Sequence, residues 1–262
     1  MVATLRWTDW SWDPPIVAGL LVLGLAYRWL LRRAPARGRQ PLCFWTGYAA
    51  LVLALLSPVD AGAAYLFTLH MFQHMLLMIV APPLLALGVP ATALGWVYRR
   101  PVLRRAYQIL WSPVVATSVY NGVLLLWHLP AAYDATLRDP LVHAVEHASF
   151  GLSGLLFWGV IVSPSPRLHA ALGVRLVMLL ASDVVNFILG FALAFAGHPL
   201  YAPYAAVPRL WGLGALEDLR LGGALMWVMG QMMYAIPLLV LLSRFLWRRG
   251  DRDEPAAPSA AA

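Results

Sequence analysis

The chain has 262 residues, of which 61% are hydrophobic and only 12% are charged. Soluble domains have roughly 45–50% apolar and about 25% charged residues, so this composition predicts a polytopic membrane protein. All 19 basic residues are arginine, which excludes a retinal protein because its Schiff base needs a lysine. The arginines gather beside apolar segments, so the net charge of +7 indicates contact with a lipid bilayer and not with nucleic acid.

The apolar segments predict an all-α fold, a bundle of seven transmembrane helices. Stretches of ~17–25 apolar residues match a hydrocarbon core of ~30 Å. The spans are expected at residues 15–31, 41–58, 63–88, 113–129, 142–162, 172–197 and 222–246. The third span contains Pro82-Pro83, which predicts a kink or a break in that helix.

The distribution of arginine sets the expected orientation. Fifteen of the 19 arginines gather at one side of the expected bundle. The positive-inside rule then predicts an N-terminus outside and a C-terminus in the cytoplasm. We therefore expect three parts: an extracytoplasmic interfacial segment over residues 1–14, the membrane domain over residues 15–249, and a disordered cytoplasmic tail over residues 250–262.

Two pairs of histidines are the main indication of function. His70 and His74 lie in the third span, and His143 and His147 lie at the start of the fifth. The two histidines of each pair are four residues apart, a spacing that puts both rings on one face of a helix. Ionisable rings are costly in hydrocarbon and mark functional sites by default. Imidazole is also a common metal ligand. Together with His128, which ends the fourth span on the same side, these residues predict a metal or cofactor site in the outer half of the membrane.

Other side chains are candidates for further ligands or for groups that orient the histidines. Thioethers together with imidazoles suit Cu(I), although a methionine stripe at helical spacing is more often core packing. An intramembrane carboxylate either orients an imidazole or bonds a neighbouring helix. These candidates are Asp60, Met71, Met75, Met78, Glu146, Asp183, His198, Met226, Met229 and Met233. His169 falls on the cytoplasmic side and is not among them.

Three other functions remain open on these residues. The run from His143 to His147 matches H-x-x-E-H, in which two histidines hold zinc and the glutamate, here Glu146, activates water; this keeps a zinc protease as one alternative. Two histidines from different helices can also ligate haem axially, which permits a haem-binding or redox protein. In a scaffold without metal, the histidines would only form hydrogen bonds between helices.

The segment HMFQHMLLMIVAPPLLALGVP, followed by WHLPAAYDATLRDPLVHAVEHASF, resembles the seven-span cytochrome c oxidase assembly factors of the CtaG type. The similarity extends over about residues 15–247 and is most specific in these two histidine-bearing segments. The resemblance implies a non-enzymatic assembly factor, a metallochaperone, in the bacterial inner membrane. Its implied partners are subunits of a haem–copper oxidase, with a periplasmic copper donor as a further one. Copper, as Cu(I), is the expected ion, and zinc suits the same ligands. The implied functional residues are His70, His74, His128, His143 and His147.

Overall fold

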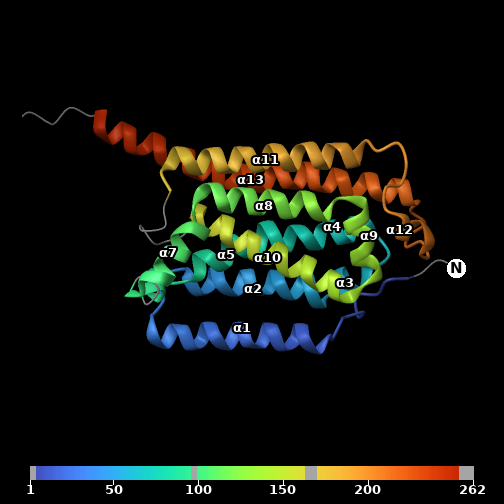
Figure 1. The fold of residues 1–262 in the computed structure, drawn as a ribbon, viewed down its shortest axis with the longest axis horizontal. Helices are drawn as coiled ribbons and strands as arrows, with labels where there is room; N and C mark the ends of the chain where they lie inside the picture. The colour runs from blue at the N-terminus through green and yellow to red at the C-terminus, as the bar shows by residue number, and fades with distance from the viewer. Residues whose placement is uncertain (1–3, 96–98, 163–169, 254–262) are drawn as a thin grey trace, which may run out of the picture.

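The computed structural model describes residues 4–95, 99–162 and 170–253. Within these ranges the regular secondary structure is helical, and the long helices lie side by side in one bundle (Figure 1). A chain of this composition favours helices because hydrocarbon offers no hydrogen bonds, so each backbone N–H must be satisfied within its own segment.

Among the described residues, seven long helical segments overlap the seven ranges expected from the sequence, and the last of them extends beyond its range at both ends. They are α1 (Pro14–Arg33), α2 (Gln40–Leu56), the continuous segment of α4 (Phe67–Met75), η1 (Leu76–Val80) and α5 (Ala81–Gly88), α8 (Pro113–Trp127), α10 (Pro140–Val162), α11 (Leu172–Ala194) and α13 (Ala215–Asp253). Shorter helices connect them: α3 (Pro58–Ala63), η2 (Ala91–Leu94), α7 (Pro101–Leu110), α9 (Pro130–Arg138) and α12 (Ala202–Ala206).

Within the part of the chain that the structure describes, five helical segments are long and apolar enough to cross a membrane, namely α1, residues 67–88, α10, α11 and Ala215–Ser243 of α13. Helices α7 and α8 add a sixth if the pair, which is bent by 57°, forms one span. Helix α2 is apolar but has only 17 residues. The structure therefore supports a helical membrane protein with five or six candidate spans, while the seventh span and the orientation stay predictions.

The segment of residues 67–88 is continuous through Pro82 and Pro83, where a kink or a break was expected, and what the structure shows is a change in helix type. A π-helical turn, η1, precedes the two prolines, which lie in the first turn of α5. Proline lacks an N–H donor and its ring pushes against the preceding turn, so the α-helical pattern cannot continue unchanged. The segment of residues 67–88 is the centre of the bundle: 67% of its apolar window is buried, against 17% for α1.

Glycines allow the helices to pack closely. A Cβ atom at Gly190 in α11 would lie 2.7 Å from the backbone nitrogen of Trp227 in α13. A Cβ atom at Gly154 in α10 would lie 2.9 Å from the carbonyl oxygen of Met78 in η1. Membrane helices associate through such small residues because lipid gives no hydrophobic drive for their contact. Gly154 thereby brings α10 against the segment that carries the first histidine pair.

The two ends of the bundle differ in what they carry. Helices α9 and α12 lie at the same end as the N-terminus, and α7 and the end of α13 lie at the opposite end (Figure 1). Helix α1 begins at Pro14, the last residue of the expected interfacial segment. Helix α13 continues to Asp253, so the tail expected over residues 250–262 begins inside a helix, and residues 254–262 lie outside the described ranges.

Candidate metal centre

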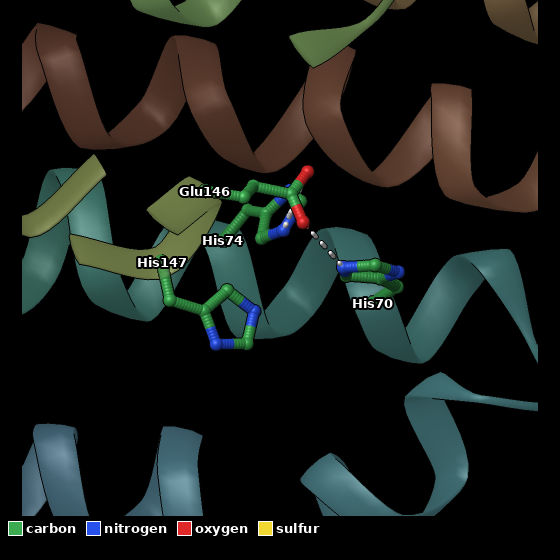
Figure 2. A group of neighbouring side chains, drawn as sticks. All are labelled: His70, His74, Glu146 and His147. Carbon is green, nitrogen blue, oxygen red and sulfur yellow. Dashed lines mark ion pairs between the residues drawn. The ribbon is translucent and has the colours of Figure 1, made fainter. Parts of the chain in front are cut away.

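Four side chains from two helices converge in the interior of the bundle (Figure 2). His70 and His74 come from α4, and Glu146 and His147 come from α10. Each side chain offers one ligand atom, and these atoms all lie within 4.8 Å of one another. We call this set the four-residue group. It joins the two histidine-bearing helices at one place, where His70 also contacts tyrosines of α9 and α12.

Helical geometry explains how short stretches of α4 and α10 bring four side chains together. His70 and His74 are one turn apart, and their ring centroids are separated by 4.3 Å. The rings of His74 and His147, on different helices, are 5.6 Å apart. Glu146 and His147 are neighbours in sequence and project about 100° apart around α10. Because α10 packs against the central segment, both side chains still reach the histidines of α4.

The atoms that face one another in the group lack hydrogen bonds. Nε2 of His70 lies 3.6 Å from Oε2 of Glu146, and Nε2 of His74 lies 3.6 Å from Oε1. Both carboxylate oxygens, both nitrogens of His74, and Nε2 of His70 and His147 are buried without a hydrogen-bond partner. Each unsatisfied buried group costs about 1–3 kcal/mol. A proton shared between Glu146 and one histidine would relieve only part of this set.

The spacing of these atoms suits a metal ion. A tetrahedral ion at ~2.0–2.1 Å from its ligands holds the ligand atoms roughly 3.4 Å apart. The two imidazole–carboxylate distances of 3.6 Å are close to that value. Three imidazoles and one carboxylate are also a donor set that zinc and copper accept. An ion at this place would give a partner to one ligand atom of each of the four side chains.

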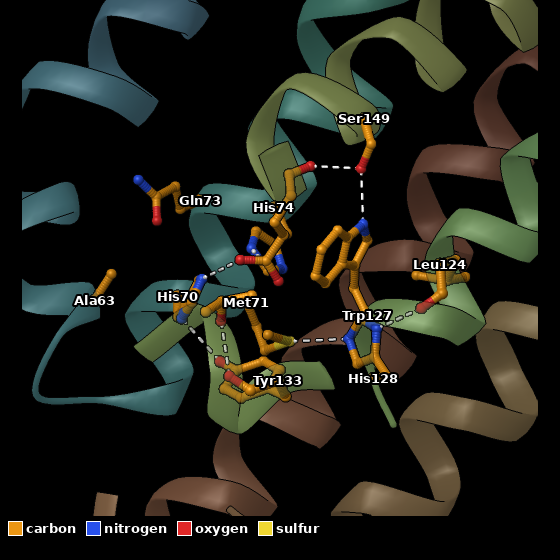
Figure 3. Close-up of polar contacts among 12 residues, drawn as sticks. Ala63, His70, Met71, Gln73, His74, Leu124, Trp127, His128, Tyr133 and Ser149 are labelled. Carbon is orange, nitrogen blue, oxygen red and sulfur yellow. Dashed lines mark hydrogen bonds and ion pairs between the residues drawn. The ribbon is translucent and has the colours of Figure 1, made fainter. Parts of the chain in front are cut away.

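Two tyrosines orient His70, and the sequence analysis did not identify them. Nδ1 of His70 lies 2.9 Å from the hydroxyl oxygens of both Tyr133 in α9 and Tyr204 in α12 (Figure 3 labels Tyr133). Tyr204 donates its proton to the carbonyl oxygen of Ala63 at 2.8 Å, so its oxygen can accept from Nδ1–H. That tautomer points the lone pair of Nε2 toward Glu146. Burial raises the pKa of both phenols well above the usual value of 10, so they stay neutral.

The start of α4 is held by a carboxylate from α13, which was also missed. Asp218 accepts hydrogen bonds from the backbone nitrogens of Phe67 at 2.7 Å and Thr68 at 3.0 Å, and from the Thr68 hydroxyl at 2.8 Å. The first N–H groups of a helix have no partner within it, and a negative charge there is favourable. Asp218 therefore fixes the first turn of the helix that carries His70.

His143 lies beside the four-residue group and nearer the surface. Its ring centroid is 4.1 Å from that of His147 and 5.3 Å from that of His70. Its side chain is half-buried, and its Nε2 atom has no hydrogen-bond partner. The sequence analysis placed His143 among the ligands and Glu146 among the secondary candidates. In the structure their positions are exchanged, because Glu146 points into the group.

His128, the fifth expected ligand, stands on the other side of His74. It follows the last residue of α8, and its ring centroid lies 6.3 Å from that of His74. Its Nδ1 atom contacts the carbonyl oxygen of Leu124 at 2.7 Å, and its Nε2 atom contacts Sδ of Met71 at 3.3 Å (Figure 3). His128 is thus a close neighbour of the group and pairs with a methionine.

The remaining candidates are spread over the molecule. Asp60 accepts a hydrogen bond of 2.8 Å from Gln73, so it contributes to packing between α3 and α4. Met75, Met78 and Met226 are buried, Met233 and Asp183 are half-buried, and Met229 and His198 are exposed. The methionines of α13 therefore face different surroundings and do not form one stripe toward the histidines. His169 lies outside the described residues.

Comparison with known proteins agrees with the sequence motifs. The profile of the cytochrome c oxidase caa3 assembly factor family (Caa3_CtaG) matches residues 16–248. The chain belongs to this family. The resemblance seen in the histidine-bearing segments is thereby confirmed, and the match extends over almost the whole helical bundle.

The curated relatives of this chain include mycobacterial proteins. The uncharacterised protein Mb0105 of Mycobacterium bovis is 28% identical over 268 residues, which cover 94% of this chain and 40% of the relative. The uncharacterised protein ML1998 of Mycobacterium leprae is 27% identical over 271 residues, which cover 93% of this chain and 40% of the relative. This chain thus spans about two-fifths of the length of the curated relatives it matches. No solved structure matches it.

Proposed function

We propose that this chain binds a copper ion with His70, His74, Glu146 and His147 and passes it to a subunit of a haem–copper cytochrome c oxidase during assembly. The observation that carries the proposal is the convergence of three imidazoles and a carboxylate whose facing atoms have no hydrogen-bond partner. Membership of the Caa3_CtaG family supports the part of the proposal that concerns cytochrome c oxidase assembly.

The charge of the site favours Cu(I). Glu146 is 0% exposed, and an uncompensated charge in hydrocarbon is expensive. With the carboxylate ionised and the imidazoles neutral, Cu(I) gives a centre with no net charge, whereas Cu(II) or Zn(II) gives a centre of +1. Imidazole and carboxylate also accept zinc, so zinc is the competing ion on ligand chemistry alone.

His143 offers a route for the ion between the surface and the group. It is half-buried, and its ring is in contact distance of His147. A ligand that is near the group but outside it can take the ion from a donor and release it inward by ligand exchange. The expected orientation puts this end of the bundle outside the cytoplasm, where a periplasmic copper donor would meet it.

Two of the alternative functions fit the geometry less well than a metal site. The H-x-x-E-H motif requires both of its histidines on zinc and its glutamate beside the ion, whereas here Glu146 is in the group and His143 is outside it. A purely structural scaffold explains the contact between α4 and α10 but leaves the orphaned atoms unexplained.

A complementation experiment tests the proposal. A bacterial strain lacking this gene receives the wild-type chain, the double variant His70→Ala/His74→Ala, or His198→Ala, which changes an exposed histidine outside the group. At equal expression, we expect the double variant to leave the oxidase inactive and low in copper, and His198→Ala to restore it fully. A double variant that supports normal oxidase activity would refute the proposal.

A further inference from the structure

The buried ring of His128 has a defined donor side. Its Nδ1 atom lies 2.7 Å from the backbone carbonyl oxygen of Leu124, one turn earlier in α8. A carbonyl oxygen only accepts hydrogen bonds, so Nδ1 carries the proton. In the neutral ring, Nε2 is then the unprotonated nitrogen and presents a lone pair.

That lone pair faces a thioether. Nε2 of His128 lies 3.3 Å from Sδ of Met71 in α4, and the exposed fractions of the two residues are 6% and 0%. A thioether sulfur has no proton to donate. Two buried acceptor atoms therefore face each other with no hydrogen between them. Protonation of the ring would supply a hydrogen, but it would place a positive charge inside the bundle at high cost.

We infer that His128 and Met71 form a second metal site, selective for a soft monovalent ion such as Cu(I). Imidazole with thioether is a donor set of that kind, and it lacks the carboxylate that a harder ion would favour. An ion about 2.0 Å from the nitrogen and about 2.3 Å from a sulfur 3.3 Å away subtends an angle of roughly 100°, which suits a trigonal or tetrahedral ion. Both donors are neutral, so a monovalent ion keeps the charge of the buried site at +1.

The surroundings hold this site rigid and place it next to the first one. The hydroxyl of Tyr201 donates to the backbone carbonyl of His128 at 3.0 Å, which fixes the end of α8. Met71 directly follows His70 in α4, and the ring of His74 lies 6.3 Å from that of His128. The chain therefore holds two neighbouring copper sites, one with a carboxylate ligand and one with a softer thioether ligand. An ion that leaves the four-residue group can bind next at the site formed by His128 and Met71. This relay rests on the proposed function, whereas the second site stands on its own geometry.

Titration of the purified chain in detergent with Ag(I), a monovalent soft ion without redox chemistry, tests the second site. The variant is Met71→Leu, which keeps the volume and removes the sulfur. The control is Met178→Leu, which changes another buried methionine, in α11. We expect two bound equivalents for wild type and Met178→Leu and one for Met71→Leu. X-ray absorption should show a sulfur neighbour in wild type and Met178→Leu that is absent in Met71→Leu. Unchanged stoichiometry and an unchanged sulfur signal in Met71→Leu would overturn the inference.

Two further variants separate this inference from the proposed function. His128→Gln should also lose one Ag(I) equivalent, so the test does not depend on the folding of Met71→Leu. His70→Ala/His74→Ala should lose the first equivalent and keep the sulfur neighbour. If the double variant loses an equivalent while Met71→Leu and His128→Gln bind as wild type, the second site is wrong and the proposed function stands. If only the latter two lose an equivalent, the second site stands and the four-residue group is not a copper site.

Discussion

Nε2 of His74 lies 3.6 Å from Oε1 of Glu146 on the neighbouring helix, and both atoms are buried without a hydrogen bond. His70 stands in the same relation to the other carboxylate oxygen. The separations exceed those of ordinary hydrogen bonds and match those of ligands on a common ion. Glu146 is the shared member of both contacts, so its charge and its oxygen atoms decide what the group can hold.

Replacing Glu146 by glutamine tests this role. Glu146→Gln keeps the shape of the side chain but removes its charge, and we expect copper affinity to fall by about tenfold or more because a charged ligand becomes neutral. Competition with a colorimetric Cu(I) chelator measures the change. Glu217→Gln, at an exposed glutamate, should bind copper as the wild type does. A protease would instead keep its metal in Glu146→Gln and lose cleavage, and wild-type copper affinity in this variant would exclude Glu146 as a ligand.

Removing the hydroxyl of Tyr133 tests how His70 is oriented. Tyr133→Phe deletes one of the two contacts to Nδ1 of His70, and we expect copper affinity to fall by about tenfold, as is usual when a group that orients a ligating histidine is lost. Tyr120→Phe is the matched control, because the hydroxyl of Tyr120 bonds to Tyr234 instead. Equal affinity in the two variants would show that the phenol contact does not tune the site.

The sequence predicted the helices better than the site. Segment length, apolar content and proline positions depend on neighbouring residues, so the seven helical ranges were accessible. The i, i+4 spacing likewise showed that His70 and His74 share a face. The rotation of α10 against α4 depends on packing between distant residues, and this is why the sequence analysis ranked His143 above Glu146.

The groups that support the site are the least visible in the sequence. Tyr204 contacts a histidine 134 residues away, and Asp218 bonds to Thr68 across 150 residues. Nothing local distinguishes Tyr204 from a tyrosine at the membrane surface, or Asp218 from an acidic residue in the first turn of α13. Contacts of this kind follow only from the assembled bundle.

Removing the hydrogen bonds that Asp218 makes to the start of α4 should lower the stability of the protein. Asp218→Ala leaves the backbone nitrogens of Phe67 and Thr68 without their acceptor, and we expect a loss of about 1–3 kcal/mol in the free energy of unfolding. Thermal unfolding in detergent, followed by circular dichroism, measures it. Asp183→Ala should not lower stability, since Oδ1 of Asp183 is buried without a hydrogen-bond partner. Equal unfolding temperatures for the two variants would contradict the claim that Asp218 stabilises the start of α4.

Two glycines of α11 should respond oppositely to the same substitution. Gly190→Ala would place a methyl group 2.7 Å from the backbone nitrogen of Trp227, so α11 and α13 must separate and stability should fall. Gly173→Ala meets nothing within 4 Å and should be neutral or stabilising by up to about 1 kcal/mol. Unfolding temperatures of the two variants in one detergent provide the comparison. A Gly190→Ala variant as stable as Gly173→Ala would disprove close packing between these helices.

His143 should control the rate of copper loading more than its strength. His143→Ala removes the half-buried ring beside the four-residue group, so we expect slower uptake and release with a nearly unchanged equilibrium affinity. Stopped-flow transfer of Cu(I) from a chelator measures the rates, and His198→Ala is the control at an exposed site. Loss of affinity as large as that in His147→Ala would make His143 a ligand of the bound ion.

The most direct measurement is the copper content of the purified protein after loading with Cu(I) under reducing conditions, determined by elemental analysis for the wild type and for His70→Ala/His74→Ala. The account predicts that the double variant holds one copper ion fewer per chain than the wild type. It also predicts that the missing ion is the one with only nitrogen and oxygen neighbours in X-ray absorption. Equal copper content in the two proteins would contradict the account.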